Sequence, residues 1–278
     1  MKKELDVFII GYELTSQFDT VHLWKNGVSQ NLTYEEKHAY YDHSLCISKS
    51  GNVYNLGWGT NAQGESIITL FKNGVEQSLI GNNGVIPDSV YVSGDDVYVM
   101  GRGFVSNSQG ISRFTNVIWK NNVSQSLSMD ENNFAGATSI CVYGEDVYYA
   151  GWRETDSKRK VATLWKNGIE QNITDGTNDA VAFYIYVAHN DIYVVGYEEN
   201  EQGYSVAKLW KNSIEQNLTD GNNNAEAYSI FVSDNDVYVV GSEKNAQGNY
   251  VAILWINGKA QALTDGKNHA WACSIFVK

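Results

Sequence analysis

One internal repeat dominates this sequence: a pattern of about 46 residues occurs six times along the chain. An aromatic residue marks each copy, and the spacings between successive marks are 47, 48, 46, 45 and 45 residues. The marks are Trp24, Phe71, Trp119, Trp165, Trp210 and Trp255. A glycine marks the same copies, at Gly11, Gly57, Gly101, Gly151, Gly196 and Gly241. A repeat of this length is typical of folds that use one supersecondary unit per copy.

Each copy contains four short runs with the composition of β-strands. In the last full copy, three of them are Ser229–Val232, Asp236–Gly241 and Val251–Trp255. The third run ends at Asn257-Gly258, and such a pair favours a two-residue hairpin because both residues accept a positive φ. The fourth run is polar and alternating, which suits an exposed edge strand. Four strands per copy, with the polar one outermost, predict a β-propeller blade.

The two ends of the chain complement each other. Ser274–Lys278 has the pattern of a first strand with nothing after it, and Glu4–Gly11 has the pattern of a second strand with nothing before it. A ring gains from joining these two strands, whereas an open solenoid would need capping repeats. We therefore predict an all-β fold: a closed six-bladed β-propeller with four antiparallel strands per blade, its first blade completed by the C-terminal strand. The predicted blades of this single domain, residues 1–278, are 274–278 plus 4–33, 44–79, 89–127, 139–173, 184–218 and 229–263.

Charge and hydropathy exclude some partners. The chain has 32 acidic and 20 basic residues and a formal net charge of -12, so phosphate backbones and anionic membrane surfaces repel it. No run of 18 apolar residues occurs, which predicts no membrane insertion. The apolar run Val7–Ile10 is too short for the core of a signal peptide. We expect a monomer that binds no nucleic acid; its location is the cytoplasm, or outside the cell if a signal peptide has been removed.

The repeat resembles a known bacterial pattern. Ala252–Gly258 reads Ala-Ile-Leu-Trp-Ile-Asn-Gly, and Leu-Thr-Asp-Gly and alanines at Ala270 and Ala272 follow it. Other copies continue with Ser-Ile-x-Val and Val-Tyr-Val-Val-Gly. This run is similar to the HAF-type repeat, although Ile253 stands where that family often has Phe. The resemblance implies a bacterial propeller, often extracellular, of a kind mostly without an assigned activity, and it supplies no catalytic residue.

The sequence predicts no catalytic motif, metal or cofactor. Nucleophile-elbow, phosphate-loop and His-Glu-x-x-His patterns are absent from it. The five histidines do not share one repeat position; His38 and His269 occupy equivalent loops, where ordinary loop residues are expected rather than metal ligands. Cys46, Cys141 and Cys273 have no metal-binding spacing and are expected to be buried free thiols.

The Asp-Gly loops after the fourth strand have two interpretations. Asp175, Asp220 and Asp265 begin equivalent loops. Calcium binding would require several oxygen ligands from one loop, and each copy offers one carboxylate. An Asx turn needs only that the aspartate accepts a hydrogen bond from the backbone two residues on. We expect the Asx turn.

Irregular aromatic residues suggest where a ligand binds. A residue needed for the fold should recur in every blade, as the strand tryptophans and the tyrosine of Val-Tyr-Val-Val-Gly nearly do. The residue after the landmark glycine varies instead, and so does Trp271 in the loop before a first strand. By the strand count, the second-to-third loops and the blade-to-blade loops lie on one face of the ring, where variable loops usually bind. The predicted ligand-binding residues on this long-loop face are Trp58, Trp152, Trp271, Tyr12, Tyr197, Arg102 and Arg153.

Three functions remain compatible with these features. We favour a non-enzymatic, lectin-like binding or scaffolding propeller whose ligand is a glycan or a protein or peptide. A hydrolase or lyase acting on glycans is the first alternative; it would need two suitably spaced carboxylates such as Asp42, Asp88 or Glu226. A purely structural module of a larger surface assembly is the second.

Overall fold

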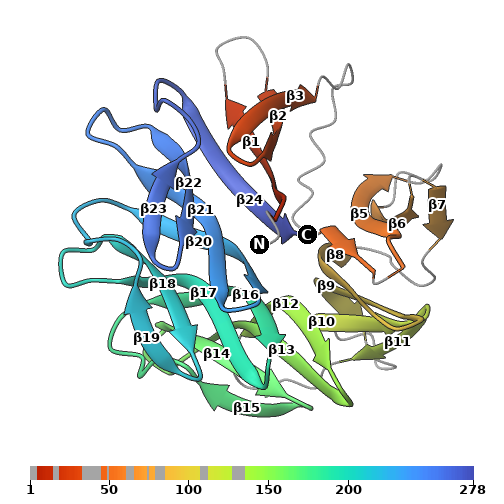
Figure 1. Ribbon diagram of the computed structural model, residues 1–278. Coiled ribbons are helices and arrows are strands. Elements are labelled where there is room, and N and C mark those ends of the chain that lie inside the picture. Colours follow the sequence, from red (N-terminus) through yellow and green to blue (C-terminus); the bar gives the residue numbers. More distant parts are fainter. Residues whose placement is uncertain are drawn as a thin grey trace. The chain divides into compact units, whose positions relative to one another are not determined.

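The residues that the computed structural model describes form six four-stranded antiparallel sheets (Figure 1). These residues are 5–14, 19–32, 45–48, 50–60, 66–73, 75–78, 85–106, 112–126 and 135–278. The chain divides into two compact units: the terminal unit is residues 1–39 with 178–278, and the central unit is residues 40–177. Each unit contains three of the sheets, and the six together follow the predicted order of four strands per repeat.

The terminal unit contains the sheets of the first, fifth and sixth repeats. The first sheet has the order β24-β1-β2-β3. Its strands are β24 (His269–Val277), β1 (Val7–Leu14), β2 (Asp19–Lys25) and β3 (Val28–Leu32). The fifth is β16 (Ala180–Ala188), β17 (Asp191–Glu199), β18 (Ser205–Lys211) and β19 (Ile214–Asn217). The sixth is β20 (Ala225–Ser233), β21 (Asp236–Lys244), β22 (Tyr250–Ile256) and β23 (Lys259–Ala262).

The central unit contains the second, third and fourth sheets. The second is β4 (Leu45–Ile47), β5 (Val53–Thr60), β6 (Ser66–Lys72) and β7 (Val75–Ser78). The third is β8 (Val85–Ser93), β9 (Asp96–Ser106), β10 (Ser112–Lys120) and β11 (Val123–Ser126). The fourth is β12 (Ala135–Tyr143), β13 (Asp146–Glu154), β14 (Lys160–Lys166) and β15 (Ile169–Asn172). The described residues include no helix that could span a membrane.

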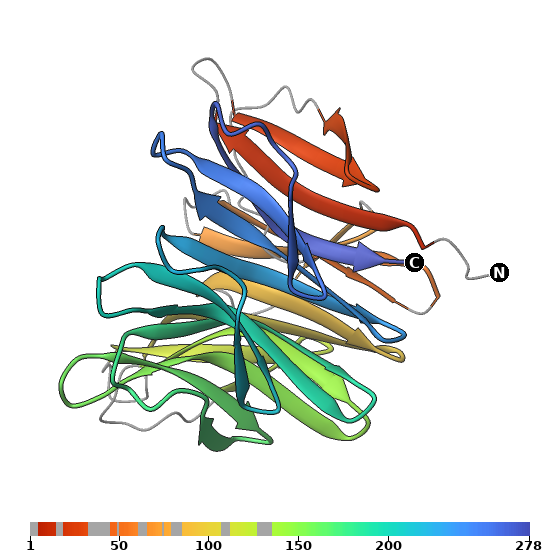
Figure 2. The same cartoon turned by 60° about the vertical axis from the view of Figure 1, so that its left-hand side comes forward.

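The predicted exchange of strands between the two ends is confirmed. β24 pairs with β1 along its length, from Val7 opposite Val277 to Leu14 opposite His269. Two backbone hydrogen bonds of 2.9 Å between Asp6 and Lys278 close the far end of the ladder. The two strands run side by side in both views, β1 in red and β24 in dark blue (Figures 1 and 2). The first repeat is therefore assembled from both ends of the chain.

An asparagine organises each turn between the third and fourth strands. Asn257 and Gly258 have φ values of 50° and 78°, as the two-residue hairpin predicts. The Asn257 side chain accepts a hydrogen bond of 2.8 Å from the backbone N–H of Val237 and donates one of 2.9 Å to Asp236. Equivalent bonds recur at Asn26, Asn73, Asn121, Asn167 and Asn212. The recurring Asn thus links this hairpin to the start of the second strand.

The strand tryptophans form the core between neighbouring sheets, as predicted. Trp255 is fully buried and packs in one cluster with Val195 and Leu209 of the fifth sheet. Trp24, 1% exposed, packs with Val240 and Leu254 of the sixth. Removing such a side chain typically costs about 3–5 kcal/mol of stability. By contrast, β15, β19 and β23 are exposed throughout, which confirms polar outer edges.

Five of the described first strands differ from the prediction because each pairs with its neighbour across a β-bulge; β4 shows no register shift. In the fifth sheet the register shifts between Ala182 and Tyr184, so that Phe183 is an extra residue. Beyond the bulge the strand continues to pair, so β12, β16 and β20 begin at Ala135, Ala180 and Ala225 rather than at 139, 184 and 229. Trp271 likewise lies within β24 and not in a loop.

The same bulge explains the landmark glycine. A Cβ atom at Gly196 would collide with the carbonyl oxygen of Val181, which the bulge brings over the second strand. Gly11, Gly151 and Gly241 meet the equivalent oxygens of Trp271, Gly136 and Glu226. Only glycine permits such a close approach of two backbones.

Candidate ligand-binding site

Two of the predicted site residues, Tyr12 and Trp271, lie directly opposite each other on β1 and β24. Their rings stack with centroids 4.9 Å apart and an interplanar angle of 23°. Cross-strand aromatic pairs of this kind stabilise a sheet and hold both rings in one orientation. Both side chains are partly exposed.

Two further aromatic residues complete this cluster. Tyr250 at the start of β22 tilts over Trp271 at 5.4 Å, and His269 stacks on Trp271 at 5.7 Å. The backbone N–H of Tyr250 donates to Nδ1 of His269 over 3.2 Å, so the second ring nitrogen, Nε2, carries the proton of the neutral imidazole. We call Tyr12, Tyr250, His269 and Trp271 the Trp271 group. The Trp271 group contains residues of both the first and the sixth sheet, which contact each other there.

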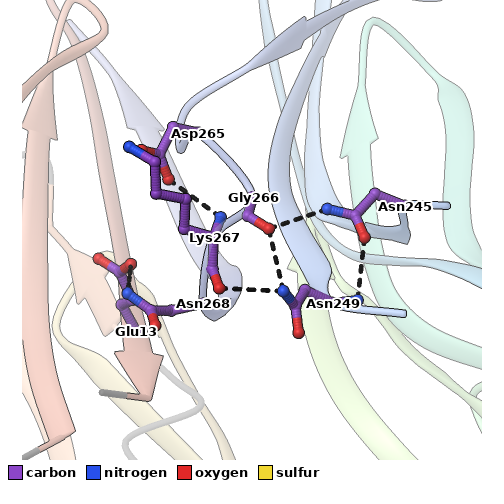
Figure 3. Close-up of polar contacts among 7 residues, drawn as sticks. All are labelled: Glu13, Asn245, Asn249, Asp265, Gly266, Lys267 and Asn268. Atoms are coloured by element: carbon purple, nitrogen blue, oxygen red, sulfur yellow. Dashed lines mark hydrogen bonds and ion pairs between the residues drawn. The ribbon is translucent and has the colours of Figure 1, made fainter. Parts of the chain in front are cut away.

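Side-chain hydrogen bonds tie the loop before β24 to the loop between β21 and β22 and to β1 (Figure 3). Gly266 accepts hydrogen bonds of 2.9 Å and 3.1 Å from the side chains of Asn245 and Asn249, and Lys267 accepts another from Asn249. Asn268 donates to Oε1 of Glu13 over 3.0 Å. Asn245 and Asn249 lie between β21 and β22, so the two kinds of long loop meet at one end of the sheets in the terminal unit, as predicted.

The Asx turns are confirmed in all three Asp-Gly loops. The carboxylates of Asp175, Asp220 and Asp265 accept backbone hydrogen bonds of 2.8 Å, 3.0 Å and 3.0 Å from the residue two positions on. Lys267 lowers the pKa of Asp265 by a side-chain hydrogen bond, whereas backbone hydrogen bonds lower those of Asp175 and Asp220. No group of three or more metal-ligating side chains occurs among the described residues.

A second group surrounds Tyr228, the bulge residue of β20. Phe183, the bulge residue of β16, packs against both Tyr228 and Tyr197 with centroids 5.6 Å apart. The Tyr228 hydroxyl lies 3.2 Å from the Ser242 hydroxyl. We call Phe183, Tyr197, Tyr228 and Glu226 the Tyr228 group. Tyr197, a predicted ligand residue, thus packs within the fold beside a bulge.

Burial dominates the electrostatics of the Tyr228 group. It raises the pKa of Glu226, and a hydrogen bond from Tyr228 partly offsets this. It also raises the pKa of Tyr197 to about 12, with the Glu226 carboxylate as the second cause. Glu226 also raises the pKa of Tyr250 in the Trp271 group, after burial as the larger cause. The Glu226 carboxylate therefore influences the pKa of a tyrosine in each of the two groups.

Two of the predicted site residues of the central unit, Trp152 and Arg153, are neighbours in β13 with different partners. Trp152 lies over Gly136, with Lys160 Nζ 5.0 Å from its ring centroid. The next residue, Arg153, bonds Glu170 at 2.8 Å on the outermost strand. Neighbouring strand residues point to opposite faces, so Trp152 and Arg153 lie on different faces of the fourth sheet. Their assignment to one ligand-binding rim stays a prediction.

Arg102 already forms an ion pair within the third sheet. Its Nε and Nη2 atoms lie 2.9 Å and 2.8 Å from the two carboxylate oxygens of Asp88, the bulge residue of β8. The predicted role of Arg102 in ligand binding stays a prediction. Trp58 lies in β5 opposite Ile68, but its side chain is outside what the structure describes. Tyr40, Tyr41, Asp42, His38 and His43 are also outside the described residues.

Sequence reasoning missed Tyr250, Phe183 and Tyr228. Tyr250 begins a third strand, where its repeat equivalents are Lys160 and Ser205, so its asymmetry is visible in the sequence. Phe183 and Tyr228 occupy the extra position of the bulge, together with Asp88, Thr138 and Cys273. In the sequence, a bulge residue can be recognised where the alternation of inward-facing and outward-facing residues breaks within a first strand.

No family model matches the chain, and no curated protein sequence matches it. Solved structures do resemble it. TolB from Acinetobacter baumannii superposes with a TM-score of 0.56 at 11% identity, over 96% of this chain and 66% of that one. Putative TolB from Agrobacterium tumefaciens superposes with a TM-score of 0.56 at 11% identity, over 99% of both chains.

The β-propeller domain of the Trilobed protease from Pyrococcus furiosus gives a TM-score of 0.54 at 13% identity, over 96% of both chains. That domain is described as having an open velcro topology, whereas β24 and β1 exchange strands here. Likeness at this identity establishes the fold alone: the chain is an all-β β-propeller of antiparallel sheets. The similarity to HAF-type repeats stays a prediction.

Proposed function

We propose that this chain is a binding module and that the Trp271 group holds a glycan at the long-loop end of the sheets. The stacked pair of Tyr12 and Trp271, extended by Tyr250 and His269, carries the proposal. Flat aromatic faces bind the apolar faces of sugar rings. Nε2–H of His269 and the ammonium of Lys244, 6.0 Å from the Tyr250 ring centroid, supply donors for hydroxyl groups.

The site is also preorganised, which supports binding. The loop Asp265–Asn268 is fixed by its Asx turn and by the bonds from Asn245 and Asn249 (Figure 3). A binding surface that is ordered before the ligand arrives loses less conformational entropy on association.

A glycan array followed by calorimetric titration tests this function. Trp271→Ala and Tyr250→Ala should each weaken binding of the best oligosaccharide by about 2- to 13-fold, since one aromatic contact contributes roughly 0.5–1.5 kcal/mol. Tyr143→Ala is the matched control, because Tyr143 is 39% exposed at the β12–β13 turn, away from the long loops. Binding of peptides but of no oligosaccharide would overturn the glycan assignment.

We further propose that the six sheets close into one ring as successive blades. The strand exchange between β24 and β1 supports it, since joining the ends of the chain in one blade is how a ring gains stability. A compact monomer of 278 residues has a radius of gyration of about 19 Å. Small-angle scattering that gives a clearly larger value for the monomer would contradict closure.

A further inference from the structure

A chain of polar contacts crosses the first sheet from its outer edge to the loop before β24. The Ser29 hydroxyl lies 2.8 Å from Nδ1 of His22. Nε2 of His22 lies 3.2 Å from Oε2 of Glu13, whose other oxygen accepts the hydrogen bond from Asn268. A serine, an imidazole and a carboxylate in sequence constitute the arrangement that activates a hydroxyl nucleophile.

The direction of the hydrogen bond between Ser29 and His22 depends on which ring nitrogen of His22 carries the proton. If the Ser29 hydroxyl donates to Nδ1, then Nε2 must hold the imidazole proton, and it faces the Glu13 carboxylate. The ring is fixed by stacking on Trp24, with centroids 5.0 Å apart at 16°. Nε2–H is not aligned well enough for a hydrogen bond to Glu13. Such contacts are commonly loose before a substrate binds.

The fifth sheet shows what a purely structural version of this cluster looks like. His22 is opposite Gly11 and Ser29 is opposite Trp24; Lys208 and Glu215 hold the same register positions opposite Gly196 and Trp210. Lys208 there bonds Glu215 at 3.0 Å and Glu198, the equivalent of Glu13, at 3.2 Å. In the fifth sheet, these ion pairs therefore take the positions that Ser29, His22 and Glu13 have in the first sheet, and they supply neither a hydroxyl nucleophile nor an imidazole base.

We propose that Ser29 is a nucleophile, activated by His22 as general base, for hydrolysis of carboxylic esters. His22 is 7% exposed, whereas Ser29 is exposed on the edge strand β3, so a substrate reaches the cluster through the serine. Glu13 is a positioning residue that acts through His22, and Asn268 orients Glu13. This activity is separate from the Trp271 group and does not depend on the binding function.

The reaction balances without any cofactor. Ser29 Oγ attacks the carbonyl carbon and its proton passes to Nδ1 of His22. The bond to the leaving alkoxide breaks, and the imidazolium returns the proton to that oxygen, which releases an alcohol and leaves an acyl-serine. Water, deprotonated by His22, then attacks the acyl group, and the carboxylic acid departs as Ser29 regains its proton.

A fluorophosphonate probe tests the nucleophile directly, since serine displaces fluoride to form a stable adduct. We expect one adduct by mass spectrometry, mapped to Ser29 and absent in Ser29→Ala. Ser124 is an internal control: it is opposite Trp119 in β11 as Ser29 is opposite Trp24, but Val117 takes the place of His22. Equal labelling of Ser29 and Ser124, or no labelling, would refute the proposal.

His22→Lys separates a catalytic role from a structural one. This variant copies the fifth sheet and can keep an ion pair with Glu13, so the fold and melting temperature should be retained, but a protonated amine accepts no proton. The labelling rate and the hydrolysis of p-nitrophenyl acetate should each fall about 10²- to 10⁴-fold, the usual contribution of a general base. In the unmodified protein, labelling should slow at acid pH. Undiminished labelling in His22→Lys would show that His22 is structural only.

Discussion

Tyr12 and Trp271 come from opposite ends of the chain and stack with their ring centroids 4.9 Å apart, on the strands that join those ends. The contact therefore contributes both to the assembly of the first sheet and to the surface of the candidate site. The two roles predict different results for mutants of the pair.

A double-mutant cycle on Tyr12→Ala and Trp271→Ala should give a coupling free energy of unfolding of about 0.5–1.5 kcal/mol, the usual contribution of an aromatic pair. Each single mutant should lose much less stability than Trp255→Ala, which removes a fully buried side chain and should cost about 3–5 kcal/mol. Denaturant titrations measure both quantities. If Trp271→Ala is as destabilising as Trp255→Ala, Trp271 is a core residue and not a member of an exposed site.

Deletion of 273–278 should strongly destabilise the terminal unit. It removes the partners of Val7, Phe8, Ile9 and Ile10 and leaves backbone groups of β1 unpaired, at roughly 1–3 kcal/mol for each buried group. Buried Ile275 and Val277 are lost as well. We expect an insoluble protein or a much lower melting temperature. An unchanged melting temperature would disprove the structural importance of the strand exchange.

Glycine substitutions at two positions should stabilise the protein. Ser213 has a φ of 64° in a hairpin where other copies have Gly168 and Gly258, and Lys158 has a φ of 65° where other copies have Gly203 and Gly248. A side chain in the left-handed region costs roughly 1–2 kcal/mol, partly offset by the greater freedom of glycine in the unfolded chain. Ser213→Gly and Lys158→Gly should each add about 0.5–1 kcal/mol to the free energy of unfolding, which urea titrations measure. Ser213→Ala is the control and should not stabilise.

Asp88 should make stability depend on pH. Burial raises the pKa of Asp88 to about 7 in the folded protein, although Arg102 opposes the shift. An unfolded aspartate titrates near 3.9, so from about pH 4 to 7 the folded state retains a proton that the unfolded state has lost. The contribution of this group is therefore greatest below about pH 4 and decreases by up to about 1.4 kcal/mol per pH unit as the pH rises to 7.

Asp88→Asn should flatten the fall in stability between pH 4 and 7, as measured by urea titrations at several pH values. Asp96→Asn is the control, because hydrogen bonds from Lys120 and Asn121 lower the pKa of this exposed carboxyl and its influence lies at more acid pH. A slope that is equally steep in Asp88→Asn would show that Asp88 is ionised in the folded protein.

The three cysteines should be reduced and slow to react. Burial raises the pKa of Cys46 to about 11 and that of Cys273 to about 12, so neither is a thiolate at neutral pH, and Cys141 is fully buried. A thiol reagent at pH 7 should modify few groups quickly in the native protein and all three cysteines after denaturation. A count of one in the denatured protein would reveal a disulfide.

The sequence by itself determined the repeats, the four strands of each, the Asn-Gly hairpins and the exchange of strands between the termini. These features depend on neighbouring residues and on a period that recurs in each copy, so the pattern is readable without coordinates. The tryptophan core follows in the same way, because a residue type that recurs at one strand position meets the same surroundings each time.

The tertiary structure alone decided which side chains meet. The bulges at Phe183 and Tyr228 shift the register between strands, and a shift of one residue turns a side chain to the other face of the sheet. The sequence predicts Arg102 and Arg153 as ligand residues, but carboxylates brought close by strand pairing already bind them. Likewise, His22 meets Ser29 and Glu13 only because β1, β2 and β3 align in one register. Such contacts depend on the register between neighbouring strands, which the residue pattern within each strand does not specify.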